Sequence, residues 1–318
     1  MLTIFSCPKP FTDPHINIIQ RNAIKSWTLL KPRPEIILIG DEEGTAEICN
    51  EFGLRHIPEV EKNEYGTPLV SSIFEIGQST ASHPLVCYIN ADIIVLSNFM
   101  ESVNMVVKLM DGQSFVLTGG RWNIDKLVPL DFKAPNWEEK LGDYVRTYGW
   151  QDKKIAMDYF LFPKNMVWGI PLFAIGRQSW DSWFVYKACV DKIPSIDGTN
   201  MITVIHTDHN YSHIPINKRN PLHSPESKLN LRLLGFWRRY TIQDSTHVLI
   251  PEGLKKQRFW LRFFIPRLMR IELWLTYYLK GAFHPYSYPL YITLRFMKHC
   301  LTATLSIVRT LGYPKLKK

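Results

Sequence analysis

The sequence predicts an α/β fold, a Rossmann-like, mostly parallel sheet flanked by helices, followed by a C-terminal amphipathic helical tail. Over the first 100 residues, short apolar runs alternate with segments of helical periodicity. This order is typical of parallel strands joined by crossover helices. From Gln257 onward the chain instead becomes aromatic and basic, which predicts a separate tail.

The first elements follow one another closely. We expect strands at 2–5, 35–41 and 54–57, because each is a short run that is mainly apolar. We expect helices at 14–30 and 45–52, from apolar positions at helical spacing and from Gly53 in the place typical of a helix C-terminus. Thr67 and Pro68 predict the N-cap and first residue of a further helix, which would run to Ile76 and end at Gly77.

The longest apolar run covers 85–96 and contains the polar step Asn90-Ala91-Asp92. We expect one buried strand here, with Asp92 delivered at its carboxyl end. Ligands of open α/β sheets bind at that edge. A carboxylate placed there can hold a divalent cation, which can in turn hold a diphosphate.

Later elements are less regular. We expect helices at 100–110 and 180–190, strands at 115–120, 159–162 and 201–206, and a loop with a helix between 123 and 154. The tail predicts two amphipathic helices, near 267–280 and 288–311. Arginine and lysine residues interrupt every tail window long enough to span a bilayer, so we expect no transmembrane helix.

Charge is unevenly distributed along the chain. The net charge is +9, but Pro251 onward holds 13 Lys and Arg against 2 Asp and Glu, whereas the first 250 residues hold 25 against 27. A near-neutral main domain argues against nucleic acid as a partner, and the basic, aromatic tail predicts docking on an anionic membrane surface. Five scattered cysteines and no visible signal peptide predict a cytoplasmic protein, peripherally associated with the membrane.

Taken in order, these elements and the Asn90-Ala91-Asp92 step resemble GT-A-fold nucleotide-diphospho-sugar glycosyltransferases of the family-2 type. The step is similar to their DxD motif, with Asn90 in the first Asp position. The resemblance covers roughly 1–235 as a catalytic domain, with a nucleotide half at about 1–100 and an acceptor half at about 101–235. It leaves 236–318 as the basic aromatic tail.

The resemblance implies a set of donor-binding residues. The loop after the first strand would hold the base and ribose, and a carboxylate after the second strand would accept hydrogen bonds from them. A helix start would face the nucleotide, the DxD-like step would contact the donor, and a later arginine would lie near phosphate. The residues in these places are Ser6, Pro8, Asp41, Tyr65, Gly66, Asn90, Ala91 and Arg121.

The resemblance also implies a metal site and a catalytic base. Asp92 would ligate Mn²⁺ or Mg²⁺, and a late histidine, His206 or His209, would complete the shell. Asp181, at the start of the helix predicted at 180–190, would remove the acceptor's hydroxyl proton, with Asp158 as the competing candidate. Trp180 and Trp183 are expected as stacking platforms for a sugar.

We therefore expect a metal-dependent glycosyltransferase that moves a sugar from a nucleotide-diphosphate donor to a hydroxyl acceptor, a lipid or a glycan. Two alternatives stay open. A nucleotidyltransferase usually has a basic Gly-rich loop after its first strand, whereas residues 6–10 contain no glycine. A non-catalytic sugar- or membrane-binding protein would retain the fold without turnover. Asn90 in place of Asp keeps this alternative open. Motifs of P-loop kinases, Rossmann dehydrogenases and α/β-hydrolases do not occur.

Overall fold

The computed structural model describes residues 1–125, 130–151, 156–166, 168–208 and 224–257, together with Arg267 and Phe296. Met1–Lys256 forms one compact unit and Gln257–Lys318 a second. Both helices expected in the tail lie outside the described residues. No helix in the described part of the chain is long and apolar enough to cross a membrane.

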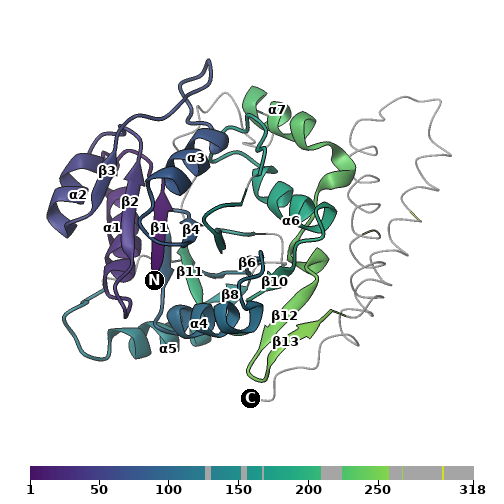
Figure 1. The fold of residues 1–318 in the computed structure, drawn as a ribbon. Coiled ribbons are helices and arrows are strands. Elements are labelled where there is room, and N and C mark those ends of the chain that lie inside the picture. The colour runs from purple at the N-terminus through teal and green to yellow at the C-terminus, as the bar shows by residue number, and fades with distance from the viewer. Residues whose placement is uncertain are drawn as a thin grey trace. The chain divides into compact units, whose positions relative to one another are not determined.

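A nine-stranded sheet runs through the first unit (Figure 1). Its spatial order is β3 (Arg55–Ile57), β2 (Glu35–Ile39), β1 (Leu2–Ser6), β4 (Leu85–Ile89), β9 (Tyr159–Pro163), β6 (Val116–Thr118), β10 (Ser195–Asp197), β12 (His247–Ile250) and β13 (Gly253–Lys256). Neighbours are parallel except around β9 and at the β12–β13 hairpin. The mostly parallel α/β fold predicted from the sequence is confirmed.

A second, four-stranded sheet has the order β5 (Ile93–Val95), β11 (Val204–Thr207), β7 (Trp122–Ile124) and β8 (Trp150–Gln151). The helices are α1 (Pro14–Thr28), α2 (Thr45–Phe52), α3 (Val70–Thr80), α4 (Asn98–Met110), α5 (Trp137–Tyr148), α6 (Trp180–Val190) and α7 (Pro225–Leu234), with short 3-10 turns η2 (Phe236–Arg238) and η3 (Ile242–Asp244).

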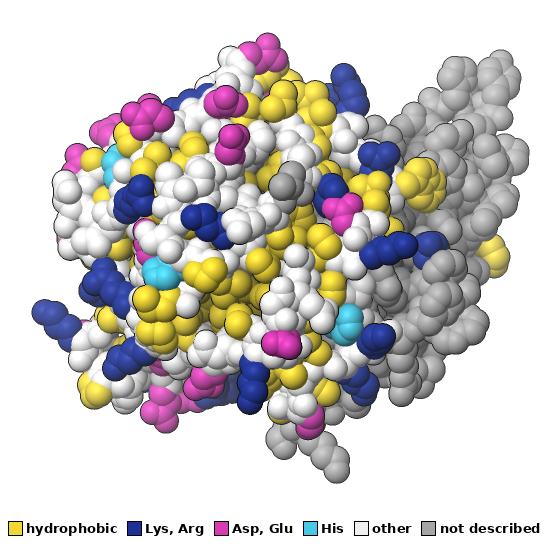
Figure 2. Space-filling view, viewed as in Figure 1, with side chains coloured by type: hydrophobic (Ala, Val, Ile, Leu, Met, Phe, Trp, Pro, Cys, Tyr) yellow, Lys and Arg dark blue, Asp and Glu magenta, His cyan; other side chains and the backbone are white. Residues whose placement is uncertain are grey.

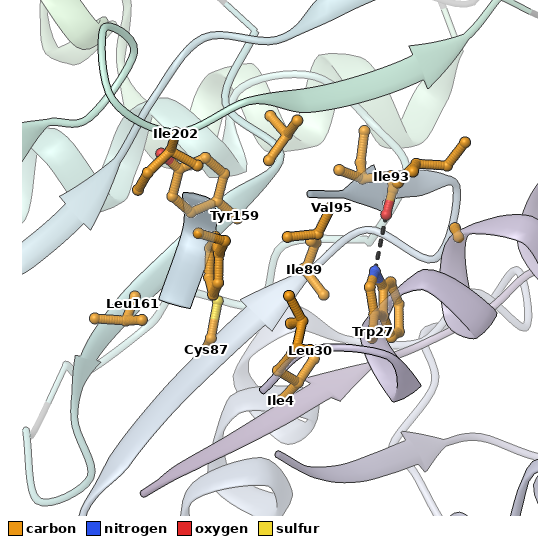
Figure 3. Close-up of a cluster of buried hydrophobic side chains, with 14 of the residues drawn as sticks. Ile4, Trp27, Leu30, Cys87, Ile89, Ile93, Val95, Tyr159, Leu161 and Ile202 are labelled. Carbon is orange, nitrogen blue, oxygen red and sulfur yellow. Dashed lines mark hydrogen bonds between the residues drawn. The ribbon is translucent and has the colours of Figure 1, made fainter. Parts of the chain in front are cut away.

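Successive strand residues point to opposite faces of the large sheet, and each face has its own apolar core. In β1, Ile4 belongs to the core that includes residues of α1, α2, α4 and α5, whereas its neighbour Phe5 belongs to the core that includes residues of α3 and α6. The helices thus cover both faces, as a parallel sheet buried on both sides requires. Figure 3 shows part of the first core, where the Trp27 side chain of α1 points toward the Ile93 carbonyl.

Asp92 follows the carboxyl end of β4, as expected, and the apolar residues that resume after it form a separate strand, β5. The chain turns at Asn90–Asp92, where the Ile93 N–H donates to the Asn90 carbonyl at 3.1 Å. β5 then leaves the large sheet and pairs antiparallel with β11. Its backbone also bonds α1, because the Trp27 Nε1–H donates to the Ile93 carbonyl at 2.8 Å (Figure 3).

The expected helix start at Thr67 is wrong. α3 begins at Val70 and runs through Gly77 to Thr80. Pro68 instead forms an antiparallel bridge with Lys62, and Leu69 forms one with Ala174. These bridges hold the segment extended, and tertiary pairing therefore overrides a favourable local capping pattern.

The main unit continues beyond residue 235, where the sequence suggested a boundary. β12 pairs with β10, and β13 pairs with β12, so both are part of the large sheet. The compact unit accordingly extends to Lys256.

Gly77 offers a test of the packing between α3 and β1. A Cβ at this position would overlap the Phe5 ring, so we expect Gly77→Ala to destabilise the protein by about 1–3 kcal/mol, as overpacking of a core does. Gly142→Ala is the matched control on α5, because its Cβ would meet only the mobile end of Arg146 at 3.2 Å. The control should be neutral or stabilising by up to about 1 kcal/mol. Urea denaturation measures both, and equal effects would contradict the packing described.

Candidate active site

Three carboxyls singled out by the sequence, those of Asp92, Asp158 and Asp181, lie near one edge of the large sheet. This edge holds the carboxyl ends of β1 and β4, and also the start of β9, because β9 runs antiparallel to β4. Asp92 follows β4, Asp158 precedes β9, and Asp181 lies in the first turn of α6. Figure 2 shows charged side chains around the margin of one face of the molecule and hydrophobic ones near its centre.

Asp92 meets two basic side chains through the same oxygen. Its Oδ2 lies 3.9 Å from His206 Nε2 and 3.3 Å from Lys9 Nζ. The Asp92 and His206 side chains are 16% and 8% exposed, so this is a sheltered site that still reaches solvent. The predicted pair of Asp92 and His206 is therefore brought together, whereas His209 lies outside the described residues.

Asn90 joins the same turn to the start of β9. Its Oδ1 accepts from the Tyr88 hydroxyl at 2.8 Å, and its Nδ2 donates to Asp158 Oδ1 at 2.9 Å. An aspartate at this position would place a second negative charge beside the Asp158 carboxylate. The two charges would be buried, and like charges repel strongly in such surroundings. The amide is thus the side chain that this position accepts, which explains the departure from two acidic residues.

Asp158 is a buried, fully engaged carboxyl. Both of its oxygens accept from Arg121 Nη1, at 3.0 and 3.1 Å. Burial raises the pKa of Asp158, the charge of Arg121 opposes this shift, and the charge of Asp92 adds to it. Arg121 thus serves as the counter-ion of Asp158. A carboxyl held in this way is poorly placed to collect a proton from a substrate.

Asp181 has the electrostatic setting of an acid–base group. Burial raises the pKa of its carboxyl from the ordinary 3.8 to about 6, opposed by a hydrogen bond from the Ser182 N–H. The charge of Asp158 raises this pKa further, and that of Arg239 lowers it. A carboxyl with a pKa near neutrality is suited to general-base or general-acid work.

The two tryptophans of α6 do not form a sugar platform, so that expectation is wrong. Trp180 is 5% exposed and Trp183 is 6% exposed. Trp180 packs edge-on against Tyr88, and Trp183 packs edge-on against Phe184. Both rings belong to the second apolar core.

Three residues of the predicted donor set lie close to this edge but are committed to structure. The buried Ser6 hydroxyl donates to the Ile89 carbonyl at 2.6 Å, which ties the end of β1 to the end of β4. Pro8 is buried, and the Ala91 side chain packs inside the first core. Any donor contact made by these residues would have to use the atoms that remain exposed.

Asp41 lies just beyond β2 and is exposed. Its Oδ1 accepts from Lys62 Nζ at 2.5 Å, and this hydrogen bond lowers the pKa of Asp41. Asp41 and Lys62 line an open groove of about 720 Å³, together with Ser72 and Ile76 of α3.

Tyr65 and Gly66 occupy a turn fastened to α7. Tyr65 is 55% exposed, and its N–H donates to Asn63 Oδ1. Asn63 Nδ2 in turn donates to Glu226 Oε1 at 2.8 Å, and Arg177 Nη2 pairs with Glu226 Oε2 at 2.7 Å. The described contacts connect this turn to α7 and to the segment before α6, and do not connect it to Asp92.

Two basic residues of the site were not singled out from the sequence. Lys9 lies within the loop already assigned to the nucleotide, and its place between Pro8 and Pro10 was the available indication. Arg239 follows η2, far along the chain from Asp181, and nothing local marks it. Its role is visible only because the fold brings the two charges together.

The donor atoms at Asp92 suit a divalent ion that is shared with a substrate. One carboxylate and one imidazole converge there, and the described residues contain no group of three or more acidic, histidine or cysteine side chains that could hold a metal alone. Ions of this kind commonly keep only one or two protein ligands and complete their shell with phosphate oxygens and water. The mixed oxygen and nitrogen pair favours Mn²⁺ over Mg²⁺, which prefers oxygen ligands.

No family model and no curated protein matches this chain. Among solved structures, GalNAc-T7 with UDP, GalNAc and Mn²⁺ is 16% identical, with a TM-score of 0.47 over 74% of this chain and 48% of that one. Glucosyl-3-phosphoglycerate synthase from Mycobacterium tuberculosis, with Mn²⁺, UDP and glucosyl-3-phosphoglycerate, is 12% identical, with a TM-score of 0.38 over 70% of this chain and 77% of that one.

S. aureus TarS 1–349 in complex with UDP is 12% identical, with a TM-score of 0.31 over 40% of this chain and 38% of that one. This chain thus spans less than half of the TarS and GalNAc-T7 chains. All three structures contain UDP, and those of GalNAc-T7 and glucosyl-3-phosphoglycerate synthase also contain Mn²⁺. At these identities and TM-scores, they do not by themselves assign an activity to this chain.

The raised pKa of Asp181 predicts a pH-dependent effect of Asp181→Asn on stability. The folded-state pKa of about 6 exceeds the ordinary 3.8, so the proton stabilises the folded protein below the ordinary value, and this contribution is lost as pH rises through the folded value. Asparagine never ionises. The stability of the variant relative to the wild type should therefore increase as the pH rises from about 4 to about 6, and stay constant at higher pH.

Urea denaturation across this range measures the difference. Asp143→Asn, at an exposed aspartate on α5, is the control for removing one negative charge. A wild-type-to-variant difference at Asp181 that does not change with pH would contradict the raised pKa.

Proposed function

We propose that this protein is a glycosyltransferase that moves a sugar from a nucleotide-diphosphate donor to a hydroxyl acceptor. The observation that carries the proposal is the meeting of two chemically different groups at one sheet edge. Asp92 and His206 offer a site for a divalent ion, and Asp181 offers a carboxyl with a pKa of about 6. The charge of Asp158 acts on Asp181 and that of Asp92 acts on Asp158, which indicates one continuous electrostatic site.

The residues divide the work of the transfer. Asp92 and His206 would hold Mn²⁺, which when bound neutralises charge on the leaving diphosphate. Asp181 accepts the proton of the acceptor hydroxyl. The hydroxyl oxygen of the acceptor then bonds the anomeric carbon, and the bond from that carbon to the diphosphate oxygen breaks. Asp158, paired with Arg121 and bonded to Asn90, positions the turn that carries Asp92. Asp181 is therefore preferred to Asp158 as the base.

Asp41 is the candidate contact for the base or ribose, because it is exposed and lies beyond the end of β2, next to β1. Its carboxylate oxygens can accept hydrogen bonds from ribose hydroxyls or an imide N–H. Lys62 would remain beside it and keep it ionised. The exposed Tyr65 and Gly66 would meet the donor only where it extends toward their turn.

We also propose that the tail places the enzyme on the cytoplasmic surface of an anionic membrane, where a lipid or lipid-linked acceptor would be available. From Pro251 onward, 13 basic residues accompany only 2 acidic ones. Aromatic residues such as Trp260, Phe263 and Trp274 are interspersed among them. Basic segments with aromatic residues bind the bilayer interface, where each Lys or Arg contributes about 1 kcal/mol.

The proposed activity is tested by two variants with opposite signatures. We expect one sugar nucleotide from a panel of UDP-, GDP-, CMP- and dTDP-sugars to raise the melting temperature in the presence of Mn²⁺, since a ligand stabilises the state that binds it. Asp92→Ala should lose the Mn²⁺-dependent part of this shift. Asp181→Asn should keep the shift and lose roughly 10²- to 10⁴-fold in transfer rate. Normal turnover of Asp181→Asn, or normal Mn²⁺ response of Asp92→Ala, would refute the corresponding role.

Co-sedimentation with vesicles tests the tail. The full chain should pellet with anionic vesicles at low salt and be released at high salt, because the attraction is electrostatic. A protein truncated after Lys256, where the first compact unit ends, should remain in the supernatant at both salt concentrations. Similar sedimentation of the two proteins would refute a membrane role for the tail.

A further inference from the structure

The backbone of Lys9 is held by two hydrogen bonds to the side chain of Gln20. The Lys9 N–H donates to Gln20 Oε1 at 2.7 Å, and Gln20 Nε2 donates back to the Lys9 carbonyl at 2.9 Å. Gln20 lies on α1 and is 1% exposed. Pro8 and Pro10 flank Lys9 and restrict the loop further. The backbone is therefore fixed, while the four-carbon side chain can still move.

The ammonium group of Lys9 lies beside the carboxylate oxygen that a bound metal ion would use. Its Nζ lies 3.3 Å from Asp92 Oδ2, the same oxygen that faces His206 Nε2 at 3.9 Å. An ammonium and a divalent cation repel each other, so each weakens the binding of the other beside one carboxylate oxygen. A metal ion on Asp92 would therefore disfavour the Lys9–Asp92 pair, and a diphosphate bound to that ion would offer Lys9 another anion.

We propose that Lys9 is a built-in cation of the donor site. It neutralises Asp92 when no divalent ion is bound, and it pairs with the donor diphosphate when an ion takes the Asp92 oxygen. The contact between Lys9 and the diphosphate rests on the proposed function. The competition between Lys9 and a divalent ion for Asp92 does not depend on that function.

Calorimetric titration of the full chain with Mn²⁺, with UDP and with uridine tests both halves. Lys9→Met removes the charge but keeps much of the side-chain length. We expect the variant to bind Mn²⁺ alone at least about tenfold more tightly than the wild type, because Asp92 no longer has a competing cation, and to bind UDP about tenfold more weakly, because a charge-assisted contact is lost. Uridine, which has no diphosphate, should bind both proteins equally.

Lys187→Met is the matched control, because Lys187 is also a partly exposed, ion-paired lysine, bonded to Asp191 on α6. It should change none of the three affinities. Unchanged Mn²⁺ affinity in Lys9→Met would overturn the competition, and unchanged UDP affinity beside a wild type that binds UDP would overturn the diphosphate contact. If the wild type binds no nucleotide, the proposed glycosyltransferase function fails, whereas the Mn²⁺ titration still decides the competition for Asp92.

Discussion

The candidate site depends on a single backbone turn, at which the chain passes from one sheet to the other. β4 belongs to the large sheet and β5 to the small one, so the intervening residues are forced to the sheet edge. Helix α1 holds the strand beyond the turn, since Ser26 Oγ accepts from the Val95 N–H at 3.0 Å and Trp27 donates to the Ile93 carbonyl. These groups are buried, where an unmade hydrogen bond is costly. The position of Asp92 therefore depends on the packing of α1.

Three carboxyls lie at this edge, and each has different charged neighbours. Asp92 faces Lys9 and His206, and Asp158 is paired with Arg121. For Asp181, burial has the largest effect on the pKa and outweighs the opposing charge of Arg239. These unequal settings distinguish Asp92, which faces two basic side chains, from Asp181, whose carboxyl has a raised pKa. Such separation of pKa values within one site is how acid–base roles are usually distributed.

Asn90 shows why a departure from an acidic pair need not weaken such a site. Its amide accepts from Tyr88 and donates to Asp158, which only a side chain with both functions can do. A second carboxylate would face the Asp158 oxygen directly. In this fold the negative charge at the turn is concentrated on Asp92, and Asn90 links the turn to the start of β9.

The sequence alone determined the alternation of strands and helices, because apolar periodicity and capping residues are local properties. The helices at 45–52 and 180–190 occur where they were predicted, and Asp92 and His206, which were singled out together, lie side by side. Tertiary structure decided the division of 85–96 between two sheets, the start of α3 at Val70, the burial of Trp180 and Trp183, and the contacts of Lys9 and Arg239. Each of these depends on partners distant in the chain, whose pairing and packing energies outweigh local preference.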